Sequence, residues 1–306
     1  MAIVRTDIPI TSAENQRVTE ELVRTYPFVR TEVITSTAFQ RPVSTLVIGS
    51  GERKVIFSAS HHANEWITSL LLLKFAEEYA EAISRGGNIY DQNARVLAEQ
   101  TTIYMVPMVD PDGVDLVVGA IREGDIQYDL AKRLGENYPD IPFPDGWKAN
   151  LLGVDLNLQY PAGWLQAREI KFSQGYIRPG PRDYVGRAPL NQLESRALAE
   201  YTRYIDPELV LAFHSQGKEI YWQFMDIQVP GAEELGRKMA DASGYTLANV
   251  PYASGFAGYK DWFIQEFRKP GYTIEVGEGV NPLPLSQFDE IYRDNLPILL
   301  IGARGS

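Results

Sequence analysis

Residues 55–66 read Val-Ile-Phe-Ser-Ala-Ser-His-His-Ala-Asn-Glu-Trp. The apolar start of this segment is typical of a buried strand, and the amphipathic pattern from Ile67 to Ala82 predicts a helix after it. His62 and Glu65 therefore lie three residues apart at a junction between a strand and a helix, where α/β proteins often bind ligands. An imidazole and a carboxylate held in this way can bind a zinc ion together.

Strand and helix patterns alternate along the rest of the chain. We expect strands at residues 31–37, 43–48, 101–107, 208–213, 219–222 and 272–276. We expect helices at residues 13–26, 67–82, 191–204, 232–243, 260–267 and 285–300, with Asn191 as the cap of its helix. The alternation shows no internal repeat or clear boundary, and it predicts one α/β domain over residues 1–306, with residues 1–28 as an N-terminal extension packed on it.

The composition narrows the possible functions. The 306 residues are 44% hydrophobic and 23% charged, as is usual for a globular protein. A net charge of −11 disfavours nucleic acid and anionic membranes as partners, and the lack of cysteine excludes disulfides and thiolate metal sites. Neither a membrane-spanning run nor a signal peptide is visible. We therefore expect a cytoplasmic protein, or a wall-associated one if the chain is part of a longer exported protein.

The chain has three histidines, and their positions suggest a metal site. His61 and His62 follow one predicted strand, and His214 ends another, while Glu275 lies in a third. A single histidine is more often a structural residue, but two histidines with a glutamate leave a fourth zinc position open, as in catalytic sites. Neighbouring residues of an extended segment point in opposite directions, so His61 is expected to be structural or to line a pocket.

Five segments of the chain, in order, resemble the motifs of the zinc carboxypeptidase family. They are His62-Ala63-Asn64-Glu65-Trp66-Ile67, Asp110-Pro111-Asp112-Gly113, Gly153-Val154-Asp155-Leu156-Asn157, His214-Ser215 and Thr273-Ile274-Glu275. The resemblance covers residues 45–300 and implies a mixed, twisted sheet of about eight strands flanked by helices. It also implies one zinc ion per chain, held by His62, Glu65 and His214.

The same resemblance implies roles for further residues. Glu275 matches the general base of the family, and Asp155 matches the acid that orients the first zinc histidine. After a gap in the alignment, Tyr252 resembles the mobile tyrosine that caps the family's pocket, and Tyr259 is a weaker alternative.

Two positions depart from the family pattern. Lys148 stands where the family has an arginine that stabilises the oxyanion, and Leu158 stands where the family has an arginine that binds the terminal carboxylate of the substrate. Leucine cannot form a bidentate pair with a carboxylate. The sequence therefore argues against ordinary carboxypeptidase recognition.

Residues 147–164 and 214–222 resemble a narrower subgroup, the γ-D-glutamyl-L-diamino acid endopeptidases. These enzymes cut bacterial cell-wall peptides between D-glutamate and diaminopimelate or lysine. The LysM wall-binding repeats that often accompany the subgroup are not visible here. The resemblance implies a murein stem peptide as partner, and we expect substrate contacts from Asn157, Lys148, Ser215 and Lys218. Cations that could meet substrate carboxylates are Lys148, Arg168, Lys171, Arg178, Arg182 and Lys218.

Other functions stay open at this point. One is a zinc exopeptidase for ordinary peptides, with an arginine of residues 165–187 replacing the missing one. Another is a binding module that recognises wall peptides without cleaving them, although such a module has no need of Glu275. A third is a related amide hydrolase that acts on acyl amino acids. The oligomeric state is also left open.

Overall fold

The computed structural model describes residues 2–305. Its α-helices are α1 (Ser12–Thr25), α2 (Ile67–Arg85), α3 (Ala94–Gln100), α4 (Pro111–Val117), α5 (Ile126–Gly135), α6 (Trp164–Ser173), α7 (Leu193–Ile205), α8 (Ala232–Ser243), α9 (Tyr259–Phe267) and α10 (Phe288–Arg304). Its strands are β1 (Val33–Ser36), β2 (Pro42–Ser44), β3 (Leu46–Ile48), β4 (Arg53–Ala59), β5 (Asn88–Ile89), β6 (Gln92–Asn93), β7 (Thr101–Val106), β8 (Leu209–His214), β9 (Glu219–Tyr221), β10 (Thr246–Ala248) and β11 (Gly271–Glu275).

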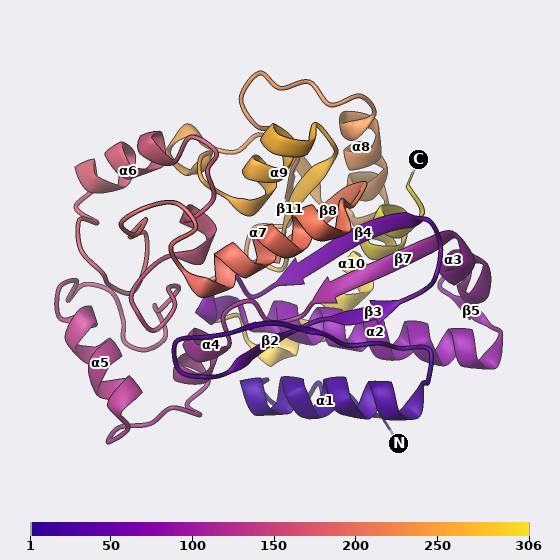
Figure 1. Cartoon of the computed structure of the whole chain (residues 1–306), viewed down its shortest axis with the longest axis horizontal. Coiled ribbons are helices and arrows are strands. Elements are labelled where there is room, and N and C mark those ends of the chain that lie inside the picture. Colours follow the sequence, from indigo (N-terminus) through magenta and orange to yellow (C-terminus); the bar gives the residue numbers. More distant parts are fainter. Residues whose placement is uncertain (1, 306) are drawn as a thin grey trace.

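One mixed sheet of seven strands forms the centre of the fold (Figure 1), in the order β10-β9-β11-β8-β4-β7-β3. The middle strands β11, β8, β4 and β7 are parallel, while β3 and β9 run antiparallel to their inner neighbours. The expected mixed α/β sheet is thereby confirmed. It has seven strands where about eight were expected, and β1 pairs with β2 in a separate two-stranded ladder.

Both faces of the sheet are covered by helices, because the central strands carry apolar side chains on both sides. Phe57 of β4 belongs to the core shared with α2 and α10, whereas Ile56 belongs to the core shared with α7 and α9. In Figure 1, α7 crosses in front of the sheet and α2 and α10 lie on its other face. This double burial explains the nearly continuous apolar runs of β4 and β8.

The carboxyl ends of three neighbouring strands lie together. In the register of the sheet, Ala59 of β4 lies beside Phe213 of β8, and Glu275 of β11 lies beside His214. Parallel strands therefore bring the segment after β4, the last residue of β8 and the last residue of β11 to one edge of the sheet. This is the edge at which open α/β sheets bind ligands.

The N-terminal segment packs on the rest of the chain through α1, which contacts α2 and α4. Asp115 of α4 accepts hydrogen bonds from the backbone N–H (2.7 Å) and the hydroxyl (2.6 Å) of Ser12. None of the helices within residues 2–305 is both long enough and apolar enough to cross a bilayer.

The predicted cap of α7 was wrong. The helix begins at Leu193, and its N-cap is Gln192, which makes no side-chain capping bond. The Asn191 side-chain oxygen instead accepts a hydrogen bond from the side-chain nitrogen of Gln192 at 3.1 Å.

Candidate active site

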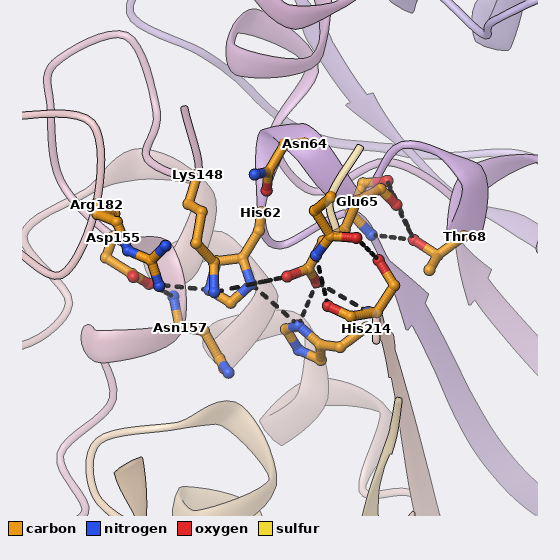
Figure 2. A network of polar contacts seen from close by, with 12 residues as sticks. His62, Asn64, Glu65, Thr68, Lys148, Asp155, Asn157, Arg182 and His214 are labelled. Atoms are coloured by element: carbon orange, nitrogen blue, oxygen red, sulfur yellow. Dashed lines mark hydrogen bonds and ion pairs between the residues drawn. The ribbon is translucent and has the colours of Figure 1, made fainter. Parts of the chain in front are cut away.

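His62, Glu65 and His214 converge at this edge of the sheet (Figure 2). His62 precedes a short 3-10 turn, η1 (Ala63–Glu65), that contains Glu65, and His214 ends β8. Nδ1 of His62 lies 2.9 Å from one carboxylate oxygen of Glu65, and Nδ1 of His214 lies 2.8 Å from the other. All three side chains are buried. Within residues 2–305, they form the one group of this kind in which ligand atoms lie within 4.8 Å of one another.

The geometry of this group fits a metal ion. The two Nδ1 atoms of His62 and His214 lie 3.2 Å apart. Two zinc–nitrogen bonds of about 2.0–2.1 Å at a tetrahedral angle separate their nitrogens by about 3.3 Å. A shared cation would accept the lone pairs of both nitrogens and neutralise the Glu65 carboxylate. Two imidazoles with one carboxylate are the donors of catalytic zinc sites.

Asp155 fixes the orientation of His62. Its Oδ1 lies 3.1 Å from Nε2 of His62, so Nε2 carries the proton and Nδ1 keeps the lone pair that a metal needs. The backbone N–H groups of Asn157 and Asp183 donate to the Asp155 carboxylate at 3.0 and 3.3 Å. Burial opposes ionisation of Asp155, but His62, Lys148 and Lys171 together outweigh it and hold the pKa of this carboxyl well below its usual range.

Ser215 contributes to the site through its backbone and its hydroxyl. Its N–H donates to Oε2 of Glu65 at 3.3 Å, and its hydroxyl donates to the side-chain oxygen of Asn281 at 2.8 Å. The backbone of Ser215 therefore orients Glu65. Both Ser215 and Asn281 line the cleft described below.

Glu275 lies at the end of β11 beside His214, outside the group of converging ligand atoms. Burial, followed by the negative charge of Glu65, raises the pKa of Glu275 to about 8. A bound dication would lower this pKa again. A carboxylate that is partly shielded from water and adjacent to the metal group is well suited to accept and return a proton.

Lys148 is held against the metal group. Its backbone carbonyl accepts the N–H of Ala63, the residue after His62, at 3.0 Å. Its ammonium nitrogen lies 3.6 Å from Oε1 of Glu65. Burial opposes its charge, but the carboxylates of Glu65, Asp155 and Asp183 together outweigh this effect and raise the pKa of Lys148. The structure thus places a cation beside the metal group.

A cleft of about 930 Å³ opens over the metal group and includes Glu275 and Lys148 in its walls. Leu158 also lines this cleft, so the position of the missing arginine is part of the site. Asn157 lines it as well, and its side-chain oxygen accepts the N–H of Tyr259 at 3.0 Å.

Lys218, which was expected to contact substrate, lies away from the cleft, and its contact with substrate stays a prediction. Its ammonium group pairs with Glu290 at 2.6 Å and Asp294 at 3.4 Å, both on α10, and Lys218 is not among the residues that line the cleft. The reason lies in the backbone, which turns at Gly217 (φ +142°) and Lys218 (φ +51°) and directs the side chain away.

Replacing Lys218 by alanine is therefore expected to change kcat/KM by no more than about twofold, because its ammonium group pairs with α10 and not with the cleft. Steady-state assays with the substrate proposed below check this expectation. Lys148→Ala is the matched comparison, since it removes a lysine that lines the cleft. A loss of kcat/KM in Lys218→Ala as large as that in Lys148→Ala would show that Lys218 does contact the substrate.

The two tyrosine candidates lie in different environments. Tyr252 is 74% exposed, and its ring packs edge-on against Phe256 with 5.1 Å between ring centroids. The flanking residues Pro251 and Ser254 line the cleft, and the capping role of Tyr252 stays a prediction. Tyr259 is fully buried and its hydroxyl lies 2.8 Å from that of Thr202, so it cannot serve as the mobile tyrosine.

Three of the six candidate cations line the cleft, and three do not. Those that line it are Lys148, Lys171 and Arg182, whereas Arg168, Arg178 and Lys218 lie elsewhere.

Sequence reasoning missed Lys260 of α9, which also lines the cleft although it is almost fully buried. Its ammonium donates to the carbonyl of Gln223 and pairs with Asp261. The only signal in the sequence was a lysine in the first turn of a predicted helix.

Comparison with known proteins agrees with this geometry. The family model described as zinc carboxypeptidase matches residues 16–298. The chain is 41% identical over 283 residues to "Gamma-D-glutamyl-L-diamino acid endopeptidase 1" of Lysinibacillus sphaericus, covering 92% of this chain and 69% of that protein. It is 36% identical to the uncharacterized protein YqgT of Bacillus subtilis, covering 92% of this chain and 73% of that protein.

Among solved structures, thrombin activatable fibrinolysis inhibitor has the same fold. It matches with a TM-score of 0.77 at 17% identity, covering 99% of this chain and 76% of that one. With the family match over nearly the whole chain, the ordered motifs and a metal group with the donors of a zinc site, the chain belongs to the zinc carboxypeptidase family.

Proposed function

We propose that this protein is a zinc peptidase that hydrolyses the amide bond between the γ-carboxyl of D-glutamate and an L-diamino acid in murein stem peptides. The observation that carries the proposal is Leu158, which lies in the wall of an otherwise complete peptidase cleft. The site retains the groups for hydrolysis but lacks, at this position, the arginine fork for a peptide's terminal carboxylate. The 41% identical relative from L. sphaericus bears the name of this activity.

The proposed division of labour follows from the positions of the side chains. Zinc, when bound by His62, Glu65 and His214, supplies a Lewis acid and lowers the pKa of water. Glu275 accepts the proton of the attacking water and returns it to the leaving amine. Lys148 stabilises the negative charge that develops on the carbonyl oxygen, as a point charge rather than as a fork.

The alternative functions agree less well with the site. A plain carboxypeptidase needs a cation for the terminal carboxylate, and because Leu158 supplies none, another cation of the cleft, such as Arg182, would have to replace it. The name of the 41% identical relative favours the endopeptidase over this alternative. A module that only binds wall peptides has no use for a glutamate placed as Glu275 is. The proposed bond occurs in intact wall and in soluble murein fragments, so the proposal applies to a cytoplasmic protein as well as to a wall-associated one.

Substrate preference tests the proposal. We expect a higher kcat/KM for γ-D-Glu-diaminopimelate peptides than for N-terminally blocked dipeptides with C-terminal Phe or Leu. The terminal carboxylate of such a dipeptide would meet Leu158 instead of an arginine, and a buried charge without a partner costs several kcal/mol. Both substrates are to be assayed in one buffer with zinc-loaded protein. A preference for the blocked dipeptides would reject the murein reading and favour the plain carboxypeptidase.

A further inference from the structure

A chain of charged contacts runs along one wall of the cleft, from Lys171 through Asp183 to Arg182. The Lys171 ammonium lies 2.6 Å from Oδ1 of Asp183, and Nε of Arg182 donates to Oδ2 of the same carboxylate at 2.7 Å. Asp183 also donates its backbone N–H to Asp155, the partner of His62. The two cations are thus linked to Asp155, and through it to His62, by one residue, Asp183.

Arg182 keeps part of its guanidinium available. Only its Nε is used by Asp183, and its two terminal nitrogens have no hydrogen-bond partner among residues 2–305. The side chain is 39% exposed and lines the cleft. A guanidinium with one edge free presents two parallel N–H donors, the arrangement that binds a carboxylate in bidentate fashion.

The other cations of the cleft wall are less able to bind a substrate carboxylate. Lys171 is 10% exposed at its side chain and is paired with Asp183, and Lys260 is buried against Gln223 and Asp261. Lys148 is proposed above to act on the carbonyl oxygen. Arg182 is therefore the cation of this wall with both exposure and unused donors.

Arg182 lies next to Lys148. The backbone N–H groups of Lys148 and Ala149 both donate to the carbonyl of Pro181, the residue before Arg182, at 2.7 and 2.9 Å. Figure 2 shows the side chains of Arg182, Asp155 and Lys148 on the same side of His62, away from His214. A substrate residue whose carbonyl oxygen meets Lys148 therefore has Arg182 beside it.

We propose that Arg182 is a specificity-determining residue that binds the free α-carboxylate of the D-glutamate on the acyl side of the scissile bond. The inference rests on the proposed function and deepens it. In a γ-glutamyl amide, the scissile carbonyl and the α-carboxylate belong to one residue and are separated by two methylenes and Cα. Two adjacent cations, Lys148 and Arg182, match two adjacent oxygen groups of one substrate residue.

The test uses two substrates that differ in this carboxylate alone. One is L-Ala-γ-D-Glu-diaminopimelate, and the other is the same peptide with the α-carboxylate converted to the neutral amide. Wild-type protein should have a kcat/KM about 10–100-fold higher for the acid, because a hydrogen bond to a charged group contributes about that factor to binding. Arg182→Ala should lose most of this preference, mainly through KM for the acid, and Arg182→Lys should restore only part of it.

Arg178→Ala is the matched control, because Arg178 belongs to the same loop but does not line the cleft. Zinc content and thermal unfolding of each variant check that the fold is intact. An acid-to-amide preference in Arg182→Ala equal to that of wild type would overturn the inference, as would an equal loss on both substrates with the fold and zinc retained. If wild-type protein cleaves neither peptide, the proposed function itself fails.

Discussion

Replacing Glu275 by glutamine is expected to lower kcat by about 10²–10⁴-fold, the usual contribution of a general base. Glutamine keeps the size of the side chain and its ability to hydrogen bond, but it cannot accept the proton. Because Glu275 lies outside the group of ligand atoms formed by the two histidines and Glu65, the variant should bind zinc as the wild type does. The measurement is steady-state hydrolysis of a γ-D-Glu-diaminopimelate peptide with metal analysis in parallel.

The two readouts separate catalysis from metal binding. Glu219 offers a matched control, because it is a second carboxylate that pairs beside Glu275 in the sheet but does not line the cleft. Glu219→Gln should retain most of the activity. A Glu275→Gln variant within a few-fold of wild-type kcat would show that the proton takes another route.

Replacing His214 by alanine is expected to lower the zinc content from about one ion per chain to a small fraction of that. The variant keeps only two of the three protein ligands, fewer than protein zinc sites use. Activity should fall with the metal. Metal analysis of purified protein by mass spectrometry measures the zinc content directly.

His61 is the matched control for this experiment. It is buried next to His214, with 5.5 Å between ring centroids, yet it supplies no atom to the metal group. His61→Gln should therefore retain zinc, provided that thermal unfolding shows an intact fold. Full zinc occupancy in His214→Ala would contradict the assignment of this ligand.

The metal group could be predicted from the sequence because its ligands sit at positions that local patterns define. His62 and Glu65 follow a recognisable strand and precede a recognisable helix, and His214 ends an apolar run. Parallel pairing then brings these strand ends together. The only long-range information required is that β4, β8 and β11 are neighbours, which the resemblance to a known family supplied.

The cleft walls could not be predicted in the same way. Arg178 and Arg182 stand four residues apart in one irregular segment, and long-range backbone contacts, among them the hydrogen bonds of residues 148–149 with Pro181, place Arg182 at the cleft. Lys218 follows His214 closely in sequence, but the turn at Gly217 directs it to α10. Side-chain directions in such loops are set by tertiary hydrogen bonds, which the local sequence does not predict.

The proposed activity is tested most directly by the masses of the products from one substrate, the tetrapeptide L-Ala-γ-D-Glu-diaminopimelate-D-Ala. Cleavage at the γ-glutamyl bond gives L-Ala-D-Glu and diaminopimelate-D-Ala, whereas removal of the last residue gives free D-alanine and a tripeptide. With zinc-loaded protein we expect the two dipeptides, and the same products about 10²–10⁴-fold more slowly when Glu275 is replaced by glutamine. Free D-alanine with the tripeptide, or an unchanged substrate, would contradict the account.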